Sequence, residues 1–149
     1  MTRTIVVGID GSATAGEALT KSVELARSLG ATLHVVSAFH AWKPDAGPIE
    51  VRAQQQAADT TEAVLERAAA AVREQGVQVA THAAAGSPGD VLIDVAEQVS
   101  ADLIVVGSQG LTGAKRFLLG SVPNNVAHHA RCDVMIVRTG DHLDQDPGA

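Results

Sequence analysis

Leu103–Val122 reads LIVVGSQGLTGAKRFLLGSV and is the most informative segment for predicting the fold. It begins with a short apolar run, Leu103–Val106, of the kind typical of a fully buried strand. Glycines follow at positions 107, 110, 113 and 120, and Ser121 stands just before a predicted helix. A buried strand that runs into a glycine-rich loop and then into a helix is typical of a parallel α/β sheet.

Outward from this stretch, apolar strand patterns alternate with helical patterns along the whole chain. The predicted strands are Thr4–Ile9, Ala31–Phe39, Val77–Ala83, Leu103–Val106 and Asp133–Arg138. Helices are predicted between them, the longest over about Glu50–Glu74 with a buried stripe of Ala57, Thr61, Val64, Ala68 and Val72. Right-handed crossovers then give a doubly wound, five-stranded, mostly parallel sheet with helices on both faces, for which we expect the order 3-2-1-4-5.

Composition narrows the function classes. The chain has 149 residues, the size of one domain, which we expect over residues 1–139, followed by a flexible acidic tail at 140–149. The formal charge of −6 disfavours duplex nucleic acid, which rewards a basic surface. Only 2% of the residues are aromatic, which disfavours a base-stacking platform for single strands.

The cellular compartment is predicted from what the sequence lacks. A single cysteine, Cys132, allows no disulfide within the chain. The first ten residues, MTRTIVVGID, are too short and too polar at their start for a signal peptide, and no apolar run approaches the ~18 residues of a membrane span. We therefore expect a cytoplasmic protein that does not associate with membranes.

The residues at the strand ends predict a phosphate site. In open α/β sheets, ligands bind beyond the carboxyl ends of the strands where the strand order reverses. Asp10 follows the first strand and the glycine-rich loop follows the fourth, so both would face one crevice. Glycines let backbone N–H groups approach an anion, the helix start at Ser121 adds a positive dipole end, and Lys115 and Arg116 add charge. Taken alone, such glycines are also ordinary turn formers.

Other chemistries find less support in the sequence. Neither a GxxxxGK[ST] motif nor a G-x-G-x-x-G motif follows the first strand, so a Walker-type or dinucleotide-binding protein is not indicated. The six histidines show no metal-ligand spacing, and no metal site of the protein's own is predicted. Ser12 and Ser108 lack the surroundings of a nucleophile elbow, so no catalytic residue is assigned.

The spaced glycines resemble the nucleotide signature of the universal stress protein family, G-x2-G-x9-G-[ST]. Gly107, Gly110, Gly120 and Ser121 match it fully, the opening IVVGIDGS resembles the family's first strand and acidic turn, and DVMIVR resembles its last strand. The resemblance spans about Thr2–Thr139. It implies an adenine nucleotide alpha hydrolase-like fold and a nucleotide-binding protein with a regulatory or stress-response role.

The resemblance also implies which positions contact the nucleotide. The acid near the nucleoside is Asp10, and Ala38 corresponds to a position whose backbone touches the adenine. The remaining positions lie at strand ends and in the phosphate loop: Gly8, Ile9, Val106, Gly107, Gln109, Gly110, Gly120, Ser121, Val122 and Pro123. Members usually form homodimers through the last strand, which is here Val134, Met135, Ile136 and Val137.

Two departures leave the ligand open between ATP and cyclic AMP. Pro123 stands where many ATP-binding members carry Ser or Thr, and it offers neither a hydroxyl nor an N–H to a triphosphate. Asp133 stands where many members have proline, and the combination GSVP…DVMIV is similar to actinobacterial members that bind cyclic AMP. Mg²⁺ would accompany ATP, with Asp10 as its contact on the protein.

Three functional interpretations remain at this stage. The first is an adenine-nucleotide-binding regulatory or stress protein that is not a fast enzyme. The second is a slow Mg²⁺-dependent ATPase in which Lys115 or Arg116 would stabilise the transferring phosphate. The third is a nucleotide-free interaction module, which the intact glycine signature disfavours.

Overall fold

The structure, a computed structural model, describes residues 2–10, 13–108 and 120–139. The predicted contacts of Gln109 and Gly110, the charges of Lys115 and Arg116, and the acidic tail at 140–149 lie outside the described residues.

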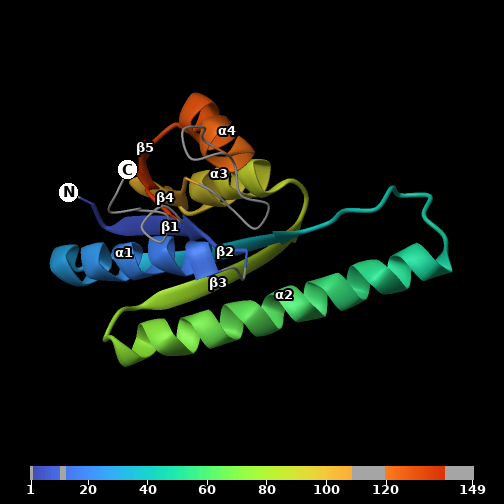
Figure 1. Cartoon of the computed structure of the whole chain (residues 1–149), viewed down its shortest axis with the longest axis horizontal. Coiled ribbons are helices and arrows are strands. Elements are labelled where there is room, and N and C mark those ends of the chain that lie inside the picture. Colours follow the sequence, from blue (N-terminus) through green and yellow to red (C-terminus); the bar gives the residue numbers. More distant parts are fainter. Residues whose placement is uncertain (1, 11–12, 109–119, 140–149) are drawn as a thin grey trace, which may run out of the picture.

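A single five-stranded sheet organises the described chain (Figure 1). Its spatial order is β3-β2-β1-β4-β5, and every neighbouring pair is parallel, as the sequence predicted. The strands are β1 (Thr4–Gly8), β2 (Thr32–Phe39), β3 (Val79–Ala85), β4 (Leu103–Gly107) and β5 (Asp133–Val137). The helices are α1 (Ala13–Leu29), α2 (Pro48–Glu74), α3 (Pro88–Gln98) and α4 (Ser121–His129). None of the helices in the described residues is long and apolar enough to cross a membrane.

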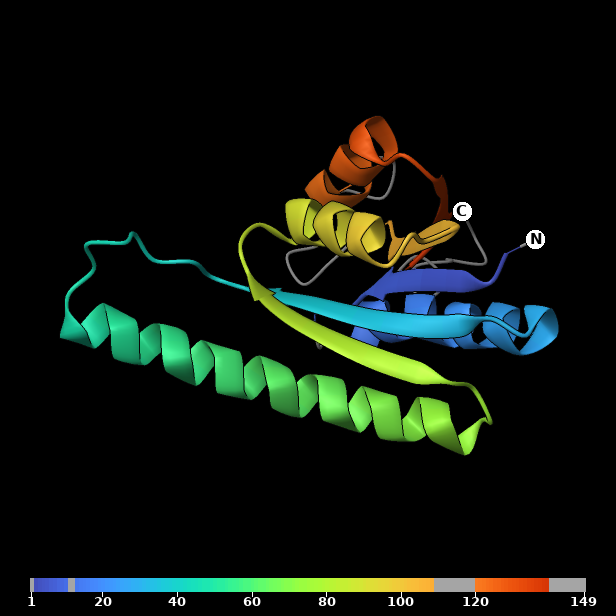
Figure 2. The same ribbon diagram turned by 180° about the vertical axis from the view of Figure 1, so that it is seen from behind.

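The two faces of the sheet bury separate cores. Ile5 and Val7 of β1 point to the face covered by α1 and α2, whereas Val6 between them points to the face covered by α3 and α4. Figures 1 and 2 show these two helical layers on opposite sides of the sheet. The alternation follows from the two-residue period of a strand, and it makes the central strands apolar throughout.

Helix α2 differs from the prediction in which residues it buries. Its buried residues are Leu65, Ala69 and Val72, so of the predicted stripe only Val72 is fully buried. Alanines on several sides of this helix blur its amphipathic pattern, and the stripe was therefore placed one residue out of phase. All of the buried residues lie in the second half of α2.

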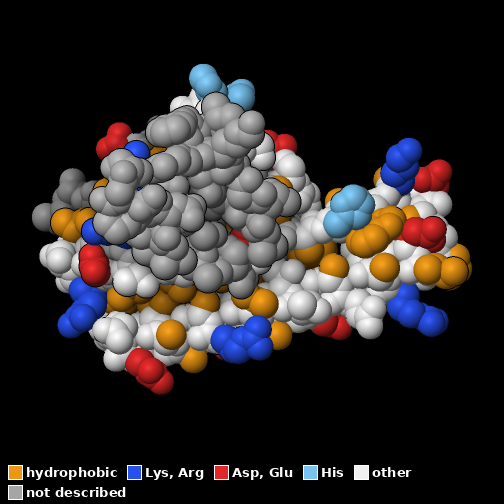
Figure 3. All heavy atoms as spheres, in the orientation of Figure 1, with side chains coloured by type: hydrophobic (Ala, Val, Ile, Leu, Met, Phe, Trp, Pro, Cys, Tyr) orange, Lys and Arg blue, Asp and Glu red, His pale blue; other side chains and the backbone are white. Residues whose placement is uncertain are grey.

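The first half of α2 and the loop before it extend past the end of the sheet (Figures 1 and 2). Ile49 and Val51 are 81% and 60% exposed there. The Trp42 N–H donates to the Gln54 side chain at 3.0 Å, which holds the loop against the helix. On the face shown in Figure 3, acidic and basic side chains are interspersed along this segment. Its visible described part therefore shows no continuous basic surface for nucleic acid.

Asp102 joins the start of β4 to the start of β1. One oxygen of its carboxylate accepts hydrogen bonds from the N–H groups of Arg3 at 2.8 Å and Thr4 at 3.0 Å. These two bonds hold the pKa of Asp102 below its ordinary value, because both favour the ionised form.

A histidine pair lies across β2 and β3. The Nδ1 of His34 and the Nε2 of His82 are 2.9 Å apart, and the two rings are stacked. Partial burial lowers the pKa of both side chains, and for His34 the neighbouring His82 lowers it further. Both shifts favour the neutral form, in which one ring nitrogen donates and the other accepts.

Candidate functional site

The site predicted from the sequence lies where β1 and β4 end side by side. Val7 of β1 pairs with Val105 of β4, so the glycines that close the two strands, Gly8 and Gly107, come at the same edge of the sheet. From β1 the chain continues to β2 on one side, whereas β4 lies on the other. This is the point of strand-order reversal at which open α/β sheets bind ligands.

Gly8 lies against a buried leucine. A Cβ at this position would lie 2.8 Å from Cδ1 and 3.1 Å from Cδ2 of Leu92, and that side chain is 3% exposed. The missing side chain thus lets α3 pack closely on the end of β1. Next to it, the Ile9 N–H donates to the Val36 carbonyl at 2.9 Å, which holds the segment leading to Asp10 against β2.

The ends of the glycine-rich loop are joined by a hydrogen bond. The N–H of Gly120 donates to the carbonyl of Ser108 at 2.9 Å. Ser108 is itself held on β5, because its N–H donates to the Val137 carbonyl at 2.8 Å and its Oγ accepts from the N–H of Thr139 at 3.0 Å. Thr139 is fully buried. The base of the loop is therefore fixed to the sheet.

The sequence places Ser121 just before helix α4, whereas in the structure Ser121 is the first residue of α4 and Gly120 is its N-cap. Ser121 is exposed in this first turn. Pro123 is buried in this turn and Val122 packs on the core beside α3.

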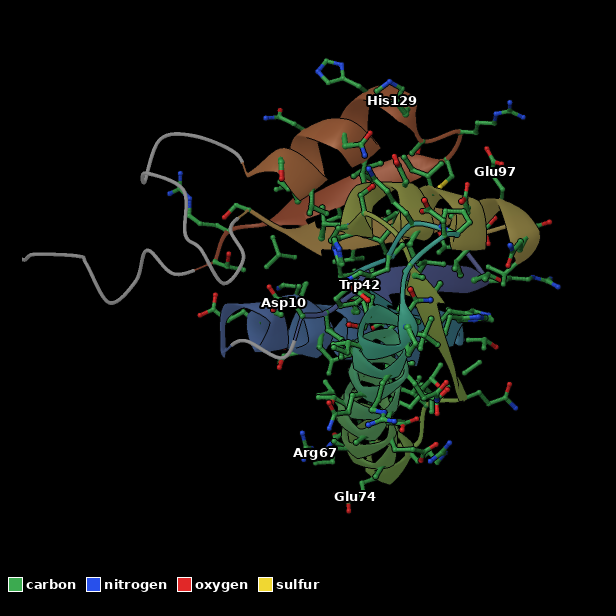
Figure 4. The ribbon with its side chains drawn as sticks, turned by 90° about the vertical axis from the view of Figure 1, so that its right-hand side faces the viewer. Asp10, Trp42, Arg67, Glu74, Glu97 and His129 are labelled. Atoms are coloured by element: carbon green, nitrogen blue, oxygen red, sulfur yellow. The ribbon has the colours of Figure 1, made fainter. Side chains whose placement is uncertain are left out.

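The predicted nucleotide contacts differ in whether their side chains pack in the cores or are exposed. The Val106 side chain is buried and those of Ile9 and Ala38 are partly buried in the two cores, so these residues offer a ligand backbone groups and no polar side chain. Asp10, directly beyond the end of β1 and labelled in Figure 4, is exposed. Among the predicted contacts near the nucleoside, Asp10 therefore offers a carboxylate to the ligand.

A polar contact that the sequence reasoning missed joins α3 to α4. The side-chain amide of Asn125 donates to Asp90 at 3.0 Å, and the Ser87 hydroxyl donates to the same carboxylate. Both bonds lower the pKa of Asp90. Ser87 is the N-cap residue of α3 and Asp90 lies in its first turn. Nothing in the spacing indicated the partner on α4.

Covalent and metal chemistry find no support among the described residues. Within residues 2–10, 13–108 and 120–139, no group of three or more His, Cys, Asp or Glu side chains is placed to hold a metal ion. The Ser108 hydroxyl is bonded at the base of the loop and has no histidine beside it in the contacts of the described chain. Burial raises the pKa of the Cys132 thiol, which opposes a reactive thiolate.

The sequence model of the universal stress protein family matches residues 1–138. A universal stress protein of Mycobacterium tuberculosis is 34% identical over 142 residues, covering 92% of this chain and 97% of the relative. One from Methanocaldococcus jannaschii is 33% identical, covering 90% of this chain and 81% of the relative.

Solved structures give the same result. The crystal structure of a universal stress protein in complex with cAMP is 32% identical, with a TM-score of 0.70 and coverage of 93% of this chain and 98% of that one. A universal stress protein from Archaeoglobus fulgidus in complex with dAMP is 25% identical, with a TM-score of 0.65 and coverage of 91% and 97%.

Proposed function

The chain belongs to the universal stress protein family, and from this premise we propose that it binds an adenine nucleotide at the edge where β1 and β4 end. The adenosine would lie near Asp10 and the backbone of Ala38, and the phosphate near the start of α4. The bond between Gly120 and Ser108 carries the proposal. It brings the last glycine of the signature to the end of β4, where the first one stands.

The first turn of α4 favours a ligand with one phosphate. The N–H of Gly120 is already bonded to Ser108, and Pro123 has no N–H. Ser121 and Val122 are left as the first-turn residues whose N–H groups have no partner within the helix. A cyclic or simple monophosphate needs fewer donors than a triphosphate, so we rank cyclic AMP above ATP. The related structures contain bound cAMP and dAMP, which are nucleotides of this class.

A binding role suits the site better than a catalytic one. The proposed role is regulatory, in a cytoplasmic stress response, and slow hydrolysis of ATP with Mg²⁺ at Asp10 is the alternative that a turnover assay tests. A second copy would pair with the outer edge of β5, which is the last strand of the sheet. Ile136 of that strand is 36% exposed, and pairing would cover it.

The test is calorimetric titration of ligand-free protein with cyclic AMP and with ATP, the latter with and without Mg²⁺. Gly120→Val should abolish binding, because its side chain would fill the space beside Ser108 at the phosphate position. Gly120→Ala is the graded variant, since its Cβ would meet Ser108 O at 3.4 Å, an ordinary contact. Its backbone, with φ −64° and ψ 169°, accepts any residue.

Gly47→Val provides the matched control. Gly47 is the N-cap of α2 with nearly the same backbone geometry, φ −74° and ψ 176°, and it lies away from the strand ends. A Cβ at Gly47 would lie 2.9 Å from Oε2 of Glu50, the end of a flexible side chain that can turn away. Both valine variants should therefore lose only a small amount of stability, and only the one at Gly120 should lose nucleotide binding. If Gly120→Val binds the nucleotide as tightly as the wild type, the proposed location of the site at this edge of the sheet is wrong.

A further inference from the structure

The contact between Asp90 and Asn125 lies beside the proposed site but touches none of the predicted nucleotide contacts. Asp90 is in the first turn of α3, where a negative charge is favoured by the helix dipole. Asn125 is on α4, four residues after Ser121 and therefore on the same side of the helix. A contact that holds the side chain of Asn125 in place therefore also restrains the first turn of α4, which begins at Ser121.

The two helices meet closely at this contact. Gly89 is buried, and a Cβ added there would lie 2.4 Å from Nδ2 and 3.0 Å from Cγ of Asn125. The amide of Asn125 therefore occupies the space that a side chain at position 89 would need. Val126, the next residue of α4, is fully buried against α3.

Neighbouring groups also contact the Asp90 carboxylate. The Ser87 hydroxyl donates to it, and the Asn125 amide donates to its Oδ1. His129 adds an attraction to the carboxylate, and its Nδ1 lies 3.0 Å from the backbone carbonyl oxygen of Asn125. Figure 4 marks His129 on α4, which lies alongside α3.

We propose that Asn125, held by Asp90, is a positioning residue for the phosphate group of the bound nucleotide. It sets the first turn of α4 relative to the end of β4 and so places the N–H groups of Ser121 and Val122. This inference rests on the proposed nucleotide site and adds a residue that determines how much the phosphate contributes to affinity.

The experiment compares cyclic AMP with adenosine, which lacks the phosphate, by calorimetry on the full chain. The Kd for adenosine divided by the Kd for cyclic AMP measures how much the phosphate contributes to affinity. Asn125→Ala should lower that ratio about five- to ten-fold, the equivalent of one ordinary hydrogen bond, while leaving adenosine affinity unchanged. General loosening of the fold would instead weaken both ligands together.

A reversal of the pair makes the test specific. Asn125→Asp alone places a second carboxylate against that of Asp90, and their repulsion should lower the ratio most. Asp90→Asn keeps a side-chain oxygen that can accept from Asn125, so it should lower the ratio little. The double variant Asp90→Asn with Asn125→Asp restores the bond with donor and acceptor exchanged, and it should recover the wild-type ratio. Asp94→Asn, one turn along α3 and exposed, is the control for loss of charge.

The outcomes separate the two proposals. If the wild-type protein binds neither ligand, the proposed function is wrong. If it binds both and Asn125→Ala leaves the ratio unchanged, or the double variant fails to recover it while remaining folded, the positioning role is wrong.

Discussion

Gly8→Ala offers a direct test of the packing between β1 and α3. The added methyl carbon would lie 2.8 Å from one terminal carbon of Leu92, 3.1 Å from the other and 3.3 Å from Cγ. Leu92 is 3% exposed, so it has little room to turn away. Overpacking of this kind costs about 1–3 kcal/mol. Alanine is favoured over glycine within a strand by about 0.5–1 kcal/mol, so the net loss should be about 1 kcal/mol and at most about 2.5 kcal/mol.

The assay is urea unfolding at one fixed protein concentration, because stability of an associating chain depends on concentration. Gly16→Ala is the matched control. Among the described residues, no atom lies within 4 Å of a Cβ at that helical position. It should therefore gain about 0.8–1 kcal/mol.

A double-mutant cycle with Leu92→Ala completes the test. Leu92→Ala alone should cost about 2–5 kcal/mol, and the methyl at position 8 would then occupy part of the vacated space. The double variant should be more stable than the sum of the single changes predicts, by about 1 kcal/mol. A Gly8→Ala protein as stable as the wild type, or a cycle additive within about 0.5 kcal/mol, would refute the close contact.

Further predictions concern the core and the titratable groups. Leu65→Ala in α2 should cost about 2–5 kcal/mol in urea unfolding, because Leu65 is among the largest fully buried side chains. The pKa of His82 is lowered from 6.5, so the unfolded chain binds more protons just below that pH, and thermal stability should fall as the pH drops from 7 toward 5. His82→Gln should flatten that decline in a series of thermal melts. The pKa of Asp102 is lowered from 3.8 in the folded protein. Its ionised carboxylate therefore contributes fully to folding stability above that pH, and this contribution is lost as the pH falls below it. Asp102→Asn should destabilise the protein at neutral pH and reduce its acid sensitivity, and a parallel acid titration that matches the wild type would contradict this.

The sheet could be predicted from the sequence because its strands are short, apolar and separated by clear helical segments. The order β3-β2-β1-β4-β5 then follows from the resemblance and from right-handed crossovers. Element ends were less predictable: β3 begins at Val79 rather than Val77, and α4 begins at Ser121. Backbone hydrogen bonds decide such ends, and the residue types at them are compatible with either assignment.

The contact between Asp90 and Asn125 could not be predicted, because no periodicity links side chains on two different helices. The same holds for the bond from Thr139 to Ser108, which joins the end of the described chain to the loop base. For α2, composition was the obstacle, since alanine favours a helix without indicating which side faces the core. The spaced glycines of the signature were more informative than the alanines of α2, because a glycine at a given position indicates a requirement of the backbone itself.

The central place of β1 has a consequence for how the chain folds during synthesis. Ile5 pairs with Leu33 on one side and with Leu103 on the other. At about 5–20 residues per second, the second partner leaves the ribosome roughly 5–20 s after the first strand. Until then one edge of the buried strand β1 is unpaired and able to join other chains. We therefore expect this half-built sheet, rather than the finished domain, to be the form that a chaperone must protect.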